Sequence, residues 1–250
     1  MKITKHITFF YIEERIQYLN KIIHETNNYK YHTDIFIHTN TFDWNMSLLH
    51  TYTNGNIQMV LHDLTNEHPY YLTWKCRDLL YNQRNDYDIF MYVEDDILVL
   101  SATIDYWVEH NEFLIKHNFN LGFLRVEIKD SDGEEYTTDV HSLRKVSEEY
   151  CENHRNPYCA FWIYNKNEFN KYTNDIHYDL RNVEACGIRE TAAFGLSALF
   201  IDGLGWYKGT LIPLINGKLD DRCKVYHLPN NYANNPDCEW GKTKYKDLLK

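Results

Sequence analysis

Three consecutive carboxylates, Glu94, Asp95 and Asp96, stand between the apolar residues 89–93 and 97–100. Like charges repel one another, and a buried carboxylate without a partner costs several kcal/mol. A strand that ends at solvent would leave the acids hydrated, but the apolar residues on both sides favour a place near the core. A hard divalent cation takes mainly oxygen ligands, so it would neutralise the acids and attract a diphosphate. We therefore expect a metal site here.

The segments around these acids alternate between strand and helix patterns. Short apolar runs predict strands at 7–10, 33–40, 56–63, 89–93 and 121–128, and apolar residues at helical spacing predict helices at 11–26, 69–83 and 102–117. This alternation predicts an α/β fold with a doubly wound, mainly parallel sheet sandwiched by helices. The acids then lie at the carboxyl end of a strand, where open α/β sheets bind ligands. Because strand side chains alternate, Glu94 and Asp96 are expected to face one way and Asp95 the other.

The second half of the chain has a less regular pattern. Residues 131–139 are rich in turn formers, 157–172 predict a strand that runs into a helix, 182–200 end in a helix, and 223–235 form a late strand and loop. We find neither an internal repeat nor a linker. The chain is therefore predicted to be a single domain, residues 1–250, with two halves that meet near residue 128.

Composition excludes several classes of protein. Hydrophobic residues make up 44 % of the 250 residues, which is enough for a large core. The formal charge of −10 argues against a general nucleic-acid binder, because such a protein needs basic residues to neutralise phosphates. No stretch predicts a signal peptide or a membrane span. The six cysteines are scattered without a Cys-x-x-Cys pair. We therefore expect a soluble cytoplasmic protein with reduced thiols and no structural zinc.

The segment YVEDDILV, with Glu94, Asp95 and Asp96, resembles the DXD-type motif of GT-A glycosyltransferases. The resemblance implies that the acids hold Mn²⁺ or Mg²⁺ against the diphosphate of a nucleotide sugar, with Asp96 as a direct ligand and Glu94 on the ribose or on a metal-bound water. It also makes residues 1–128 the nucleotide-sugar-binding half and 129–250 the acceptor-binding half. The first position of the motif is Glu94, where the family has Asp. It therefore stays open how Glu94 and Asp96 divide the two roles.

The same resemblance implies a further metal ligand and a catalytic base from the second half. His227 ends a short apolar strand, and a neutral imidazole suits Mn²⁺ better than Mg²⁺. Glu190, near the start of a helix, matches the place of the carboxylate base in inverting members, where it would accept the acceptor hydroxyl's proton. Glu184 is the second candidate for the base and Asp139 the third.

In such folds, strand ends and the first loops hold the nucleotide base. The candidates are Phe10, Tyr11, Thr39, Asn40 and Asp63; the aromatic rings could stack on the base and Asp63 could accept from a base N–H. For each residue taken singly, a core aromatic or a capping acid is the alternative.

A cation for the diphosphate is predicted on the segment before the carboxylate strand. Lys75 and Arg77 are two residues apart and do not share a helix face, so at most one serves. Arg77 is favoured for its forked contacts with phosphate. On the acceptor side, Trp162, Trp206 and Tyr207 are the candidate sugar platforms, and Trp206 lies in a glycine-rich loop.

The function expected from these residues is metal-dependent transfer of a sugar from a nucleoside-diphosphate sugar, with UDP favoured, to a saccharide or other hydroxyl acceptor. Inversion is expected, and retention stays open because no nucleophile is identifiable. One alternative is a sugar nucleotidyltransferase, but the segment after the first strand lacks that class's glycine-rich basic signature. The other is a non-catalytic carbohydrate-binding protein.

Overall fold

The computed structural model describes residues 1–44, 49, 51–153, 158–174, 187–189 and 207–249. The chain forms two compact units, each made from two stretches: Met1–Ile97 with Ala160–Gly195, and Leu98–Cys159 with Leu196–Lys250. The predicted boundary near residue 128 falls inside the second unit. Helices and strands mix in both units, which confirms the α/β class.

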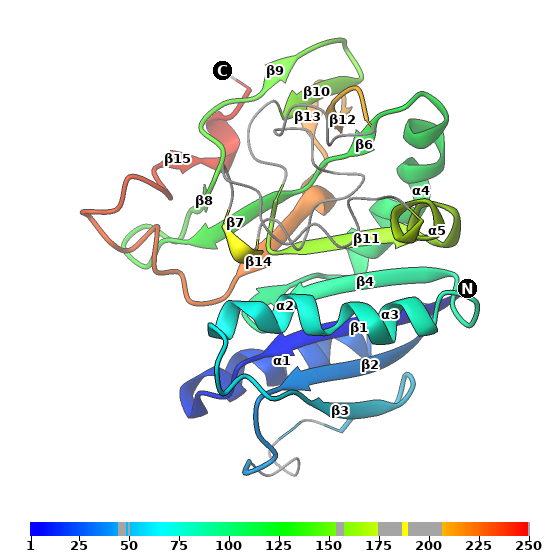
Figure 1. Ribbon diagram of the computed structural model, residues 1–250. Helices are drawn as coiled ribbons and strands as arrows, with labels where there is room; N and C mark the ends of the chain where they lie inside the picture. Colours follow the sequence, from blue (N-terminus) through cyan, green and yellow to red (C-terminus); the bar gives the residue numbers. More distant parts are fainter. Residues whose placement is uncertain (45–48, 50, 154–157, 175–186, 190–206, 250) are drawn as a thin grey trace. The chain divides into compact units, whose positions relative to one another are not determined.

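The first unit is built on one five-stranded sheet with the order β11-β4-β1-β2-β3 (Figure 1). The strands are β1 (Lys2–Phe9), β2 (His32–Thr39), β3 (Ile57–Leu61), β4 (Ile89–Glu94) and β11 (Phe161–Asn165). The first four are parallel, and β11 is antiparallel to β4. The prediction of a mainly parallel sheet is confirmed for this unit.

Helices cover both faces of this sheet. The helices are α1 (Ile16–Thr26), preceded by the 3-10 turn Glu13–Arg15, then α2 (Leu72–Lys75), preceded by the 3-10 turn Pro69–Tyr71, α3 (Arg77–Asn82) and α5 (Lys166–Thr173). Neighbouring side chains of β1 show the two faces: Lys5 donates to Thr26 of α1, whereas His6 contacts Gln83 at the end of α3. The periodic apolar residues of α1 are buried, as its pattern predicts.

Every residue of β4 is buried, because the strand has β1 on one side, β11 on the other and side chains packed over both faces. Its continuous apolar run predicts such a strand. The register pairs Thr8 of β1 with Glu94, so both strands end at the same edge of the sheet.

A row of three imidazoles crosses β1, β2 and the end of β3 on the face covered by α3. His6 Nδ1 lies 2.8 Å from His38 Nε2, and His38 Nδ1 lies 2.7 Å from His62 Nε2. At the His6 end of the row, Gln83 Oε1 lies 3.0 Å from His6 Nε2 and accepts its proton. His6 Nδ1 then accepts from His38 Nε2–H, and His38 Nδ1 from His62 Nε2–H, so each ring carries its proton on Nε2. Burial lowers the pKa of His6 to about 3 and also lowers that of His38, so the row is neutral.

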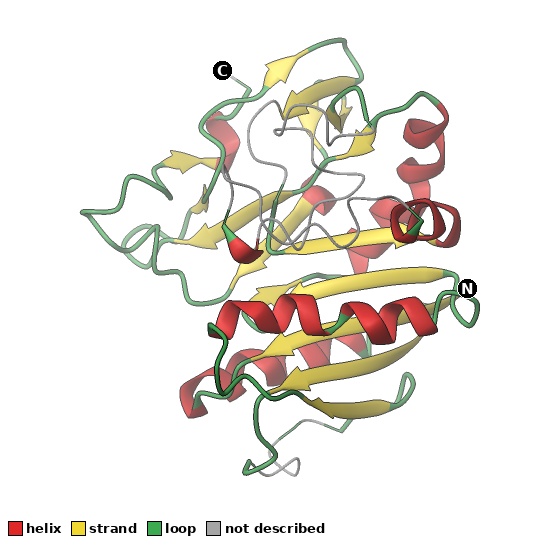
Figure 2. Cartoon of the chain, in the orientation of Figure 1, coloured by secondary structure: helices red, strands yellow, loops and turns green. Residues whose placement is uncertain are grey.

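The described part of the second unit consists of two sheets with shorter strands, one α-helix and extended loops (Figure 2). The sheet orders are β13-β12-β10-β9, with β6 beside β12, and β15-β8-β7-β14-β5. The elements are β5 (Ile97–Leu98, where the chain leaves the first unit), α4 (Ser101–Lys116), β6 (Asn120–Leu121), β7 (Leu124–Ile128), β8 (Glu135–Thr137), β9 (Arg144–Lys145), β10 (Tyr150–Asn153), β12 (Thr210–Ile215), β13 (Lys218–Leu219), the 3-10 turn Asp221–Cys223, β14 (Lys224–His227), β15 (Thr243–Lys244) and the 3-10 turn Tyr245–Asp247.

Several expectations for the second half can be compared with these elements. The strand and helix in 157–172 are confirmed as β11 and α5, although they belong to the first unit, and the late strand is β14. The predicted loop 131–139 contains β8, which pairs with β7 across a turn at Gly133, where φ is +67°. The predicted helix in 182–200 lies outside the described residues apart from 187–189. Among the helices described, none is long and apolar enough to cross a bilayer.

Candidate functional site

The three carboxylates lie together at the carboxyl end of β4. Glu94 is the last residue of the strand, and Asp95 and Asp96 form the turn that follows. All three residues are only 5 to 6 % exposed. Because the strand stops at Glu94, the expected alternation of side chains stops there too, and Asp95 and Asp96 both accept from Arg15 although they were predicted to face opposite ways.

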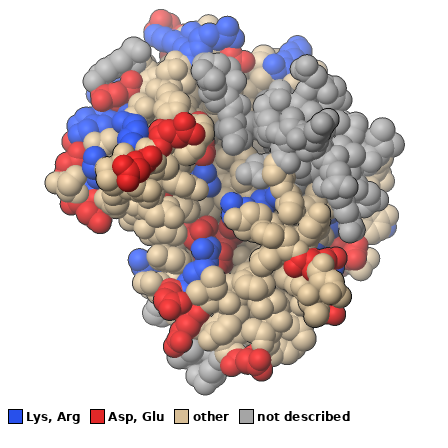
Figure 3. All heavy atoms as spheres, turned by 60° about the vertical axis from the view of Figure 1, so that its left-hand side comes forward, with Lys and Arg blue, Asp and Glu red and all other residues tan. Residues whose placement is uncertain are grey.

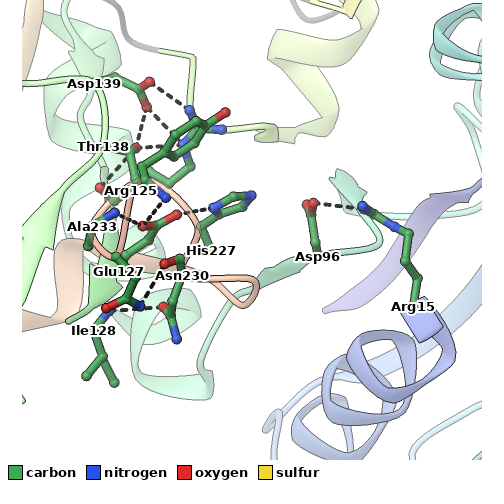
Figure 4. A network of polar contacts seen from close by, with 12 residues as sticks. Arg15, Asp96, Arg125, Glu127, Ile128, Thr138, Asp139, His227, Asn230 and Ala233 are labelled. Atoms are coloured by element: carbon green, nitrogen blue, oxygen red, sulfur yellow. Dashed lines mark hydrogen bonds and ion pairs between the residues drawn. The ribbon is translucent and has the colours of Figure 1, made fainter. Parts of the chain in front are cut away.

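Arg15 holds two of the three acids. Its Nε and Nη2 donate to the two oxygens of Asp95 at 2.7 and 2.6 Å, and Nη2 also donates to Asp96 Oδ2 at 2.8 Å (Figure 4 shows the Asp96 contact). Arg15 ends the 3-10 turn that precedes α1, next to the carboxyl ends of the parallel strands. A forked guanidinium–carboxylate contact is stronger and better oriented than a single ion pair.

Arg189 holds the third acid. Its Nη1 donates to Glu94 Oε2 at 2.6 Å, and its guanidinium carbon lies 4.2 Å from the ring centroid of Tyr70. The backbone just before it is fixed because Trp74 Nε1 donates to the carbonyl of Ile188 at 3.1 Å. Among the described residues, the acids are therefore paired with two arginines, one that precedes them along the chain and one that follows them.

The electrostatics of the Arg15–Asp95 pair combine opposing effects. Burial raises the pKa of Asp95, and the charges of Asp96 and Glu94 add to this, while Arg15 lowers it. Burial alone would lower the pKa of Arg15, but its bonds to Asp95 and Asp96 reverse this and raise it. Burial is the largest of these effects, so the pKa of Asp95 stays above that of an ordinary aspartate. At neutral pH we favour the ionised form, because N···O distances of 2.6 and 2.7 Å to a permanently charged guanidinium are those of charge-assisted bonds.

A cavity of about 310 Å³ opens beside the cluster within the first unit. Its lining joins apolar and aromatic side chains to both arginines and two of the acids: Thr8, Phe10, Ile12, Arg15, Pro69, Tyr70, Leu72, Thr73, Glu94, Asp95 and Arg189. An apolar cleft with a few convergent charged groups is the usual form of a small-molecule site. Its size and lining suit a planar ring attached to an anionic group.

Of the five residues predicted to hold the nucleotide base, one lines the cavity and four do not. Phe10 lines the cavity. Tyr11 and Asn40 lie together, since the Tyr11 backbone N–H donates to Asn40 Oδ1 at 2.8 Å. Thr39 is buried, and Asp63 caps a turn by accepting from the backbone and hydroxyl of Thr65. Asp63 therefore has the capping role that was its alternative.

The predicted cations on the preceding helices are used elsewhere. Arg77 is buried, with its guanidinium 4.0 Å from the Trp74 ring centroid and a hydrogen bond to the Tyr172 hydroxyl. Lys75 pairs with Glu67 at 2.7 Å. Neither residue lines the cavity. Arg77 packs α3 against α5, which sequence spacing cannot reveal because Tyr172 is 95 residues away.

His227 ends β14 in the second unit, where it belongs to a separate buried network. Its Nδ1 lies 2.5 Å from Oε1 of Glu127, a fully buried residue on β7, and Glu127 Oε2 accepts from the backbone N–H groups of Tyr232 and Ala233 at 2.9 and 2.6 Å (Figure 4). Glu127 therefore keeps the proton of a neutral His227 ring on Nδ1, so that Nε2 carries the lone pair. Metal-binding histidines are commonly oriented in this way.

The remaining predicted residues have different outcomes. Asp139 forms a forked pair with Arg125, at 2.9 and 2.7 Å. Trp162 is buried on β11 between Tyr92 and Tyr164, so it is a core residue and the prediction of a sugar platform is wrong for it. Tyr207 is half-buried. Glu184, Glu190 and Trp206 lie outside the described residues, and their predicted roles stay predictions.

The metal expectation can be tested against the donor set. Three buried carboxylates offer the hard oxygen ligands that Mn²⁺ or Mg²⁺ prefers. Among the described residues, however, no three His, Cys, Asp or Glu side chains are grouped as a metal site, and the oxygens of the cluster accept from Arg15 and Arg189 instead. The donors therefore suit a divalent cation chemically, provided that the cation displaces a guanidinium.

Arg15 and Arg189 are the residues that sequence reasoning missed at this site. A signal existed for Arg15, because the first turn after one parallel strand lies at the same edge as the end of its neighbour. No local signal identifies Arg189. The chain matches no protein-family profile and no curated protein.

Proposed function

We propose that the protein is a glycosyltransferase of the GT-A type that transfers a sugar from a nucleoside-diphosphate sugar, UDP favoured, to a hydroxyl acceptor. One observation carries the proposal. Three buried carboxylates lie at the carboxyl end of β4, an inner strand of the mainly parallel sheet, and two of them line a cavity that also presents two guanidinium groups and aromatic side chains. Fold alone would support only a broad class of functions, whereas this combination matches the chemistry of a nucleotide diphosphate.

In this proposal, the first unit binds the donor. Phe10 and Tyr70 offer aromatic surfaces for a planar base, and Arg15 and Arg189 offer N–H donors for phosphate oxygens. Asp96 and Glu94 would hold Mn²⁺ or Mg²⁺, and His227 stays the predicted nitrogen ligand. When bound, the cation supplies Lewis-acid stabilisation of the departing diphosphate.

The acceptor side depends on predicted residues. A sugar hydroxyl is a weak nucleophile until a base removes its proton, and Glu190 is the proposed base. Direct inversion follows if Glu190 acts in this way. The role of the enzyme would then be mainly to orient the two sugars and to stabilise the leaving group.

Surface charge is consistent with a small-molecule substrate. On the face in Figure 3, the described Lys and Arg side chains are interspersed with Asp and Glu side chains. Together with the formal charge of −10, this arrangement gives nucleic acid no continuous basic track on that face.

A donor panel tests the proposal. The protein is incubated with Mn²⁺ and individual nucleotide sugars, and released nucleoside diphosphate is measured, with the exposed-acid variant Glu148→Gln as an activity control. Slow hydrolysis of one donor supports the transferase. Consumption of a nucleoside triphosphate with a sugar phosphate would instead indicate a nucleotidyltransferase, and binding of sugar without turnover a carbohydrate-binding protein.

A further inference from the structure

The cavity of the first unit presents its two guanidinium groups to acids of the same protein. The side chains of Arg15 and Arg189 are 29 % and 32 % exposed, while the side chains of their partners Asp95, Asp96 and Glu94 are 7 to 9 % exposed. The acids are therefore fixed in the floor of the site, and the arginines reach them from its accessible side.

The two arginines are held to different degrees. Arg189 lies against the Tyr70 ring, and the carbonyl of Ile188, the residue before it, accepts from Trp74. Arg15 projects from a short 3-10 turn that has no side-chain cap, and a single nitrogen, Nη2, is shared between Asp95 and Asp96. Arg15 therefore bridges two acids, so an exchange of this one guanidinium would open oxygens of both Asp95 and Asp96 to a cation.

Charge in the cluster favours such an exchange. Three carboxylates and two guanidinium groups sum to a formal charge of −1, which repels a diphosphate. A divalent cation on the acids changes the sum to +1. It also competes directly with Arg15 for Asp96 Oδ2, and a carboxylate oxygen is a ligand that a hard cation binds strongly.

We propose that Arg15 is an exchangeable internal cation: a divalent ion displaces it from Asp95 and Asp96, and the released guanidinium binds the diphosphate of the donor. The second half of this inference rests on the proposed function, whereas the first half does not. Arg189 keeps its place on Tyr70. The forked N–H groups of Arg15, which match a carboxylate in the absence of the ion, match two phosphate oxygens equally well.

Mn²⁺ binding by the apo protein tests the exchange directly. Free Mn²⁺ is measured by electron paramagnetic resonance, without nucleotide, for wild type, Arg15→Gln and Arg15→Lys, with Arg84→Gln as the control for loss of an arginine elsewhere in the unit. We expect Arg15→Gln to bind Mn²⁺ at least about 10-fold more tightly than wild type, because the competing charge is gone. Arg15→Lys, which keeps the charge, should stay within a few-fold of wild type.

UDP binding at saturating Mn²⁺ tests the second half. Arg15→Gln should bind UDP at least about 10-fold more weakly, which is the opposite direction to its effect on Mn²⁺. Arg15→Lys should lie between Arg15→Gln and wild type. A purely structural role for Arg15 would weaken both ligands together.

A measurement on wild type covers the case in which the variants do not fold. The Arg15 Nε–H signal in a ¹⁵N NMR spectrum should shift on addition of Mg²⁺ alone, and that of Arg84 should not. Unchanged or weaker Mn²⁺ binding by folded Arg15→Gln, or an unmoved Arg15 signal, overturns the exchange. Tighter Mn²⁺ binding by Arg15→Gln with no UDP binding by wild type supports the exchange but refutes the proposed donor site.

Discussion

Each unit contains a buried carboxylate network beside a predicted site residue, and these two networks neutralise their acids differently. In the first, Glu94, Asp95 and Asp96 are met by the long, partly exposed side chains of two arginines. In the second, Glu127 is met by His227 and by two backbone N–H groups, which cannot move away without moving the chain. A carboxylate held by backbone donors stabilises a fold, whereas one held by an exchangeable cation beside a cavity can take another ligand.

The largest effect expected from this contrast is on turnover. Asp96→Asn should lower the transfer or donor-hydrolysis rate by about 10³-fold, because a neutral amide no longer supports the cation that stabilises the leaving group. Its free energy of unfolding should change little, since Arg15 keeps the forked contact with Asp95. Steady-state kinetics and urea denaturation measure both. A large loss of stability with an unchanged rate per folded molecule would show that Asp96 stabilises the fold and does not support turnover.

Glu127→Gln should show the reverse pattern for stability. The amide offers one acceptor where the carboxylate offers two, so its NH₂ group must face either His227 Nδ1–H or the N–H groups of Tyr232 and Ala233. A buried donor facing a donor should lower the free energy of unfolding by about 3 kcal/mol. Urea denaturation measures this. Wild-type stability in this variant would show that the Glu127 network is not structural.

A smaller effect is expected from pH, through the His6–His38–His62 row. The folded-state pKa of His6 is about 3, and that of His38 is also lowered, so between pH 7 and 5.5 the unfolded state takes up protons that the folded row does not. Stability should therefore fall as the pH falls through this window, by about 1 kcal/mol for each of the two.

Asp95 is expected to contribute to stability in the opposite direction over the same pH range. Its pKa is raised, so the folded state takes up a proton before the unfolded state does, and stability rises as the pH falls. Asp95→Asn removes this opposing contribution and should lose stability more steeply than wild type from pH 7 to 5.5, as followed by denaturation midpoints. Equal slopes would mean that Asp95 titrates as an ordinary carboxylate.

Much of the first unit follows from local patterns. The apolar run of β4 marks a strand covered on both faces, and the spacing of Ile16, Leu19, Ile22 and Ile23 marks the buried side of α1. The acids then fall at the end of β4 by position alone. These predictions depend on residue periods of two and 3.6, which are properties of the chain itself.

The assignments that failed concern contacts between distant segments. Arg77 was favoured for phosphate and Trp162 for sugar, yet both pack in the core beside α5 and β4. A basic or aromatic side chain has the same appearance in sequence whether it faces solvent or another helix. The partners of the acids were missed for the same reason, because Arg15 and Arg189 lie 80 and 95 residues from them.

By itself, the sequence determined that three carboxylates would end a buried parallel strand, since periodicity and chain order decide where a strand stops. Only the tertiary structure decided which positive groups meet those acids, that His227 is oriented by Glu127, and that a cavity opens beside Arg15 and Arg189. The physical reason is that local conformation depends on neighbours along the chain, whereas charge pairing depends on distances that folding alone creates.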